Sequence, residues 1–248
     1  MNFKRGVNSI ATAATRPVDQ RNEFLSGTPR AGTVDRWIYV FTAALFIVIT
    51  LLGFIPDSIM KIAAVQSGER PPFPLVLHIH AVLMGTFLLL LLAQTTLMAM
   101  GKSQPHRQLG VAALAVAAAL VVVGLILVPT MYHYVWRAAL TSSPVAHDKL
   151  QKIVLRRDNV MLLQLRVGLL FPLFLWIGAR ARERDGGLHK RMMILATALP
   201  LVAGIDRITW LPTTNPASPL STDLYILLAV TPWLSETSFG TKQCTGLI

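Results

Sequence analysis

The sequence contains little cysteine and little charge. Of its 248 residues, one is a cysteine and 14% are charged. A single cysteine excludes an intrachain disulfide and a cysteine-based metal site. Soluble globular domains have about 25% charged residues. Because 53% of this chain is hydrophobic and those residues fall in long runs, the composition is typical of a membrane protein.

Acidic residues are scarce relative to basic ones. The chain has 12 Asp and Glu against 23 Lys and Arg, which gives a net charge of +11. In a soluble protein this balance would suggest nucleic-acid binding, but no basic stripe is interleaved with aromatic residues here. We therefore expect no nucleic-acid partner. The basic loops are instead expected to contact anionic headgroups of the lipid bilayer.

The apolar runs predict an all-α, polytopic transmembrane helix bundle with five clear spans and a short or incomplete sixth. Residues 1–36 have no apolar signal-peptide core and are expected to be a basic, disordered cytoplasmic arm. Residues 37–234 would form the transmembrane domain, and 235–248 a polar tail. The predicted spans are 37–55, 75–100, 109–128, 160–177 and 192–211, with the short sixth run at 224–234.

The distribution of Lys and Arg between the loops predicts the orientation. More of them fall on the side of the N-terminus, so the N-terminus is expected inside, in the cytoplasmic membrane of a bacterium. The third loop is an exception, because it is also basic. Its stretch 144–158 mixes apolar and charged residues and is expected to be a short interfacial helix, preceded by an aromatic belt at 132–136.

Polar side chains in three of the predicted spans fall at one depth, in the outer half of the membrane. Such groups are costly in lipid and normally face the interior of a bundle. They predict a polar intramembrane site. Its residues are His78 and His80 in the second span, Gln164 and Arg166 in the fourth, and Asp206 and Arg207 in the fifth.

Helical geometry suggests how these groups are used. His78 and His80 point about 200° apart on a helix. We expect His80 to face the bundle and His78 to lie nearer the membrane surface. Arg166 is expected to pair with Asp206, either as a structural ion pair or as part of a proton or solute path.

A second polar layer is predicted at the inner interface, where His106 and His189 begin two of the helices. Two interpretations stay open. The histidines and the neighbouring Lys and Arg residues would anchor the chain to headgroups, or the histidines would serve as ligands or proton carriers.

Two stretches carry a resemblance. "HAVLMGTFLLLLLAQTTLMAMGKSQPHRQLG" and "HKRMMILATALPLVAGIDR" resemble a family of bacterial polytopic membrane proteins of unknown function. The resemblance covers about residues 37–234 and implies membrane location without an activity. A looser likeness links the chain to cytochrome b561-type bundles, which hold one haem near each membrane face. That likeness implies His80 with His133, and His106 with His189, as axial ligands of haem b.

The sequence favours a cofactor-free transport or accessory protein with a polar site in the outer leaflet. The alternative is a b-type haem protein that transfers electrons. A metal-dependent enzyme acting on lipid is the weakest hypothesis, because the chain has no HxxxH box and few acidic ligands. No catalytic residue and no metal-ion site is predicted.

Overall fold

The computed structural model describes residues 29–69, 71–140, 144–214 and 218–239, and every regular element among them is helical. This confirms the predicted all-α bundle. The elements are α1 (Pro29–Gln66), α2 (Leu75–Ala99), α3 (Ser103–Leu140), α4 (Pro144–Ala181), α5 (Gly186–Ala198), the 3₁₀ turn η2 (Leu199–Leu201), α6 (Val202–Ile205) and α7 (Leu220–Phe239).

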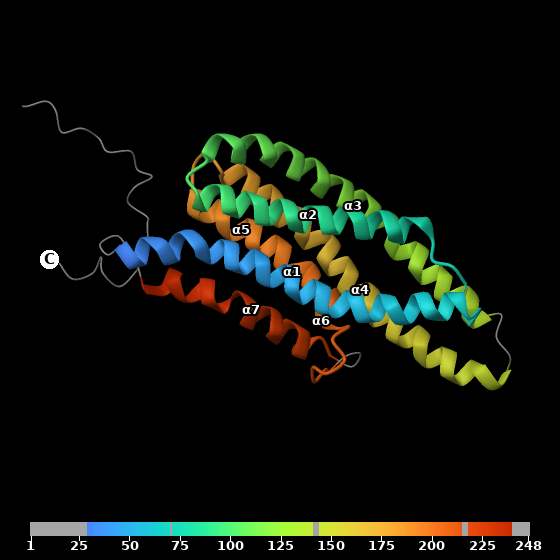
Figure 1. Cartoon of the computed structure of the whole chain (residues 1–248). Coiled ribbons are helices and arrows are strands. Elements are labelled where there is room, and N and C mark those ends of the chain that lie inside the picture. The colour runs from blue at the N-terminus through green and yellow to red at the C-terminus, as the bar shows by residue number, and fades with distance from the viewer. Residues whose placement is uncertain (1–28, 70, 141–143, 215–217, 240–248) are drawn as a thin grey trace, which may run out of the picture.

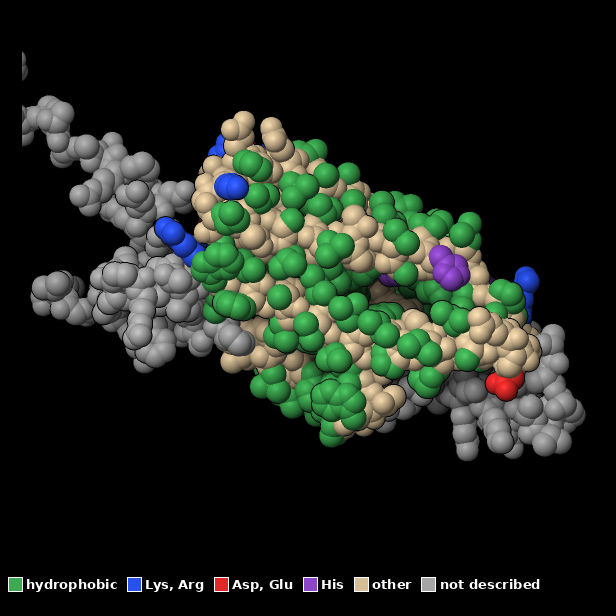
Figure 2. Space-filling model, in the orientation of Figure 1, with side chains coloured by type: hydrophobic (Ala, Val, Ile, Leu, Met, Phe, Trp, Pro, Cys, Tyr) green, Lys and Arg blue, Asp and Glu red, His purple; other side chains and the backbone are tan. Residues whose placement is uncertain are grey.

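Five segments are long and apolar enough to cross a membrane, as in a multi-pass membrane protein. The segment formed by α5, η2 and α6 is one of them, whereas the described apolar part of α7 is shorter. Side chains that would be buried in a soluble protein lie on the surface of the bundle: Leu169 is 73% exposed and Val111 is 68% exposed. In Figure 2, hydrophobic side chains cover most of the visible face, and Lys and Arg gather near its two ends.

The long helices extend further than the hydrophobic runs that predicted them. Helices α1, α3 and α4 each have 38 residues. At about 1.5 Å per residue they are about 57 Å long, against roughly 30 Å for the hydrocarbon core. Backbone hydrogen bonding therefore continues past the apolar run. As a result α1 begins at Pro29, inside the predicted arm, and 144–158 is the first part of α4, not a separate interfacial helix.

The helices run up and down, so the chain has two loop ends. The α1–α2 loop, the end of α3 and the start of α4 lie at the predicted outer end, and loops α2–α3 and α4–α5 lie at the predicted inner end (Figure 1). Helix α7 lies beside α1. The fifth predicted run ends at Ile205 and not at residue 211, because the chain leaves the helix after α6; within the run, Pro200 lies in the 3₁₀ turn η2 between α5 and α6.

The core is a seam of apolar side chains between the helices. Phe46, Ile194 and Leu201 are almost completely buried and join α1 to the fifth span. A second cluster centres on the edge-to-face contact of Phe87 with Phe171, whose ring centroids are 5.5 Å apart. Lipid is as apolar as these side chains, so close packing holds the helices together.

Two glycines face one another where α1 meets α6. A Cβ atom on Gly53 would lie 2.1 Å from the carbonyl oxygen of Gly204. Backbones therefore touch where α1 meets α6, which no larger residue would allow. This contact positions the next turn of α1, with Asp57, beside Arg207.

A glycine turn and a helix cap determine where α3 and α5 begin at the predicted inner end. Gly101, in the loop between α2 and α3, has φ of 74°, a conformation that suits glycine. The side chain of Asp185 accepts a hydrogen bond from the amide of Leu188 and caps the start of α5. The first turns of α3 and α5, with His106 and His189, are thereby placed at the same end of the bundle.

Candidate functional site

Buried and half-buried polar side chains, together with the exposed Gln164, gather in two places. The outer polar layer lies at the predicted outer end, and the inner polar cluster lies at the opposite end. The outer polar layer consists of Asp57, Lys61, His80, Gln164, Arg166, Asp206, Arg207 and Asp223. The inner polar cluster consists of Gln94, His106 and His189.

Helix contacts place Arg166 and the end of α6 at similar depths. Gly178 of α4 contacts Met192 of α5, and the two helices are antiparallel. Arg166 lies twelve residues before Gly178, and Gly204 lies twelve residues after Met192. Both are therefore about 18 Å from that contact.

The same reasoning places His80. It lies seven residues before Phe87, and Arg166 lies five residues before the Phe171 that Phe87 contacts. Helices α2 and α4 run in the same direction, so His80 and Arg166 differ in depth by about 3 Å. His80 is half-buried and its Nδ1 atom is fully buried, whereas His78 is exposed. Of the two histidines, His80 is the one that faces the bundle.

Arg166 pairs with Asp223 and not with Asp206, the partner predicted from the sequence. Its guanidinium donates two hydrogen bonds to the carboxylate of Asp223 in α7, at 2.8 and 3.1 Å. Asp206, the predicted partner, is half-buried near the end of α6. The error has a physical reason: α7 packs along α1 and α6, which brings its first turn to the depth of Arg166. Hydropathy alone cannot place such a short helix.

A second ion-pair network connects α1 to the end of α6. Arg207 Nε donates to Asp57 Oδ2 at 3.1 Å, and Lys61 contacts the same oxygen. The guanidinium of Arg207 also lies 4.5 Å from the ring centroid of Phe54, as in a cation–π contact. Asp57 was missed as a site residue. Its signal was present, since an acidic residue ends the first apolar run with a lysine four positions later.

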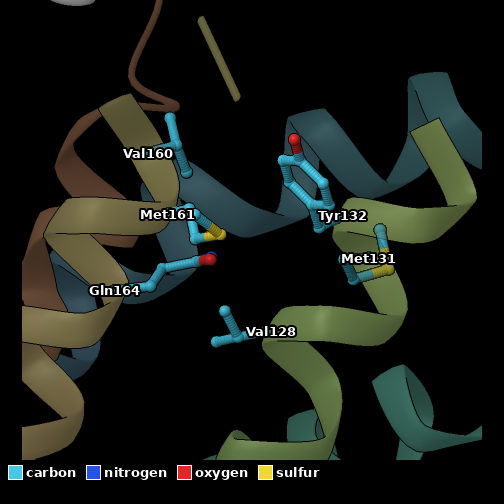
Figure 3. Close-up of a pocket in the computed structure, with 6 residues that line it drawn as sticks. All are labelled: Val128, Met131, Tyr132, Val160, Met161 and Gln164. Carbon is cyan, nitrogen blue, oxygen red and sulfur yellow. The ribbon is translucent and has the colours of Figure 1, made fainter. Parts of the chain in front are cut away.

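Gln164 lines a small cavity between α3 and α4. The cavity of about 10 Å³ has room for about one water molecule. Figure 3 shows Gln164 and Met161 on α4 facing the side chains of α3 across this space. The lining residues are Val128, Met131, Tyr132, Val160, Met161 and Gln164.

Four buried side-chain atoms in the described part of the chain have no hydrogen-bond partner. They are Nδ1 of His80, Nε of Arg166, Oε1 of Gln94 and Nδ1 of His106. The first two belong to the outer polar layer and the last two to the inner polar cluster. A buried polar atom without a partner costs about 1–3 kcal/mol. A water molecule, solute or ion that contacts one of these atoms would therefore recover part of that free energy.

The inner polar cluster joins three helices. The ring centroids of His106 in α3 and His189 in α5 are 6.4 Å apart, and the rings are nearly perpendicular at 87°. The main-chain carbonyl of Gln94 in α2 lies beside the imidazole of His106. Nδ1 of His189 is 2.8 Å from the carbonyl oxygen of Gly178, which can only accept, so Nδ1 is the donor.

The two-haem arrangement fits only at one end. The spacing of His106 and His189 suits two axial ligands. The other pair is separated: Tyr134, next to His133, donates to the carbonyl of Pro71, which precedes α2. His80 lies nine residues further along the chain, in the second turn of α2. His133 is also exposed.

No protein-family model, curated protein or solved structure matches this chain. The resemblance to the bacterial membrane family therefore stays a prediction.

Proposed function

We propose that the chain is a transport or accessory protein of the bacterial inner membrane, and that its outer polar layer binds a small polar solute or a polar group of a partner. This role needs no cofactor. The proposal rests mainly on His80 and Arg166, which each leave one buried nitrogen without a partner at nearly the same depth. Polar groups held inside a membrane bundle typically mark a substrate or ion pathway.

The balance of charged side chains in the outer polar layer indicates what net charge a bound solute would carry. Lys61, Arg166 and Arg207 are balanced by Asp57, Asp206 and Asp223. The ion pairs of the layer already satisfy most of these charges. A neutral or zwitterionic solute would meet hydrogen-bonding groups without leaving a charge unpaired, whereas a strongly charged solute would have to displace an existing pair.

The topology is part of the proposal. With the N-terminus in the cytoplasm, the outer polar layer lies toward the periplasm, and the Lys and Arg residues of the inner loops meet anionic headgroups. Arg180 supports this arrangement at the inner end. It lies 4.9 Å from the ring centroid of Trp176, and that tryptophan is 56% exposed on the bundle surface, as expected of an interfacial aromatic residue.

Water access to the outer polar layer tests the proposal. In a Cys244→Ser background, a cysteine at Gln164 should react with a membrane-impermeant, hydrophilic thiol reagent added outside the inner membrane, for example to spheroplasts. A cysteine at Leu169, one and a half turns deeper and 73% exposed on the bundle surface, should not react because it faces lipid. Equal reactivity at the two positions, or reaction of Gln164→Cys only from the cytoplasmic side, would contradict the proposal.

The haem alternative is supported by the inner pair alone. If a haem were bound there, His106 and His189 would supply its axial ligands and the group would supply one-electron chemistry. An absorption spectrum of the purified protein decides this alternative. A haem band that is lost in His189→Ala, with the helical content retained, would favour electron transfer over the proposed solute-binding role.

A further inference from the structure

The inner polar cluster has no role in solute binding at the outer end, and it brings together two histidine rings from different helices. Nδ1 of His189 donates to the carbonyl of Gly178, which leaves Nε2 as a nitrogen with a free lone pair. A second-shell hydrogen bond from one ring nitrogen to a backbone carbonyl is the usual way to orient a metal-binding histidine. His106 has a buried Nδ1 without a hydrogen-bond partner.

The separation of the rings suits one ion between them. An imidazole nitrogen binds a metal at roughly 2.0–2.1 Å, so two rings on opposite sides of one ion have centres about 6–6.5 Å apart. The observed distance between the ring centroids is 6.4 Å. The two rings belong to different helices, α3 and α5. Their spacing is therefore set by the packing of these helices and not by their separation in the sequence.

The surroundings favour an ion of low charge. His106 and His189 are each the fourth residue of a helix, where the helix dipole is positive, and Arg107 and Lys190 follow them in the sequence. No group of three or more His, Cys, Asp or Glu side chains that could hold a metal occurs among the described residues. Zinc carries two positive charges and prefers four ligands, so two neutral imidazoles would bind it weakly.

Copper(I) meets these constraints. It carries one charge, is satisfied by two ligands in line, and is bound by imidazole and by soft thioether ligands. A thioether is nearby: the methyl end of Met193 lies 2.9 Å from where a Cβ atom of Gly178 would be, next to the carbonyl that holds His189. An anion is a poorer occupant, because Nε2 of a neutral His189 has no proton to donate.

We propose that His106 and His189 bind a single copper(I) ion at the inner end of the bundle. This site is independent of the outer polar layer, and the proposal does not rest on the proposed function. A bare ion also fits the position better than a haem does, because the contacts of Gly178 with Met192 and Met193 pack α4 tightly against α5 next to His189.

Copper(I) titration of the purified full chain tests the proposal. The protein would carry Cys244→Ser, to remove the thiol, and an affinity tag without histidine. Under anaerobic conditions and in competition with the chelator bathocuproine disulfonate, we expect one copper(I) per chain, with two nitrogen neighbours by X-ray absorption. His106→Gln and His189→Gln should each abolish binding. The matched control His133→Gln, at an exposed histidine, should retain it.

A second measurement uses only the parent protein, so that it remains informative if the glutamine variants fail to fold. In the parent protein, bound copper(I) should protect His106 and His189, and not His133, from modification by diethylpyrocarbonate, read by mass spectrometry. The proposal is overturned if the parent takes up no copper(I), if either glutamine variant still binds it, if protection is equal at all histidines, or if the protein is purified with haem at this pair.

Discussion

Replacing Asp223 with Asn should lower the free energy of unfolding by about 1–2 kcal/mol, because the ion pair that is broken is partly exposed. Asparagine keeps one acceptor oxygen but carries no charge, so the Arg166 guanidinium loses its ion pair and at least one of its two hydrogen bonds. Breaking a buried ion pair by removing one partner costs about 3–5 kcal/mol, and partial exposure reduces that figure. In this pair the side chains are 36% and 41% exposed. The free energy would be measured in detergent by titration with SDS.

A double-mutant cycle measures the interaction energy between Arg166 and Asp223 apart from the contacts that each makes with other residues. The combined change Arg166→Leu with Asp223→Leu should be milder than either single change, because no charge is left alone. The control is Arg182 with Glu183, a pair at 3.4 Å whose side chains are 62% and 78% exposed. Glu183→Gln should change stability by less than about 1 kcal/mol. Additive losses for Arg166 and Asp223 would show that the two residues do not interact.

Replacing Gly53 with Ala should destabilise the bundle by about 3 kcal/mol. The new methyl group would lie 2.1 Å from the carbonyl oxygen of Gly204, and the atom that must move belongs to the backbone. Overpacking of this kind costs about 1–3 kcal/mol and more where the backbone cannot yield. Because the contact positions Asp57 beside Arg207, the variant should also weaken that ion pair.

Two glycines with free space provide the control for Gly53. A Cβ atom on Gly85 or Gly124 would meet nothing within 4 Å. Alanine at either position should be neutral or stabilising by about 0.5–1 kcal/mol, since glycine is a poorer helix former. The same SDS titration would compare all three variants. A loss at Gly53→Ala no larger than at Gly85→Ala would mean that α1 and α6 do not touch as described.

The helical class was predictable because it depends on composition over long stretches. Runs such as 75–100 and 109–128 exceed what a soluble helix needs, and both are helical in the structure. Helix ends were not predictable from hydropathy. Helix α3 continues to Leu140 because the backbone remains hydrogen-bonded where the side chains become polar. Hydropathy indicates whether a residue lies in lipid or in water, and it does not indicate where a helix ends.

The pairing of charges depends on tertiary packing, and the sequence could not supply it. Arg166 and Asp223 are 57 positions apart, and their contact exists only because α7 packs back along α1. The sequence did indicate which residues carry polar groups into the spans. Helical spacing predicted that His78 and His80 point in different directions. The stripe that His80 shares with Met84 and Gln94 predicted that His80 is the one facing the bundle.

The central claim is that polar side chains from several helices share one depth near the predicted outer face of a membrane bundle. Spin labels in a Cys244→Ser protein, reconstituted in lipid, measure depth directly through their relative exposure to oxygen and to a water-soluble nickel complex. Labels at His78 and Gln164 should be accessible to the nickel complex, and labels at Leu89 and Leu173 should be accessible to oxygen. Equal values at the four positions, or nickel access at Leu89 and Leu173 alone, would contradict the account.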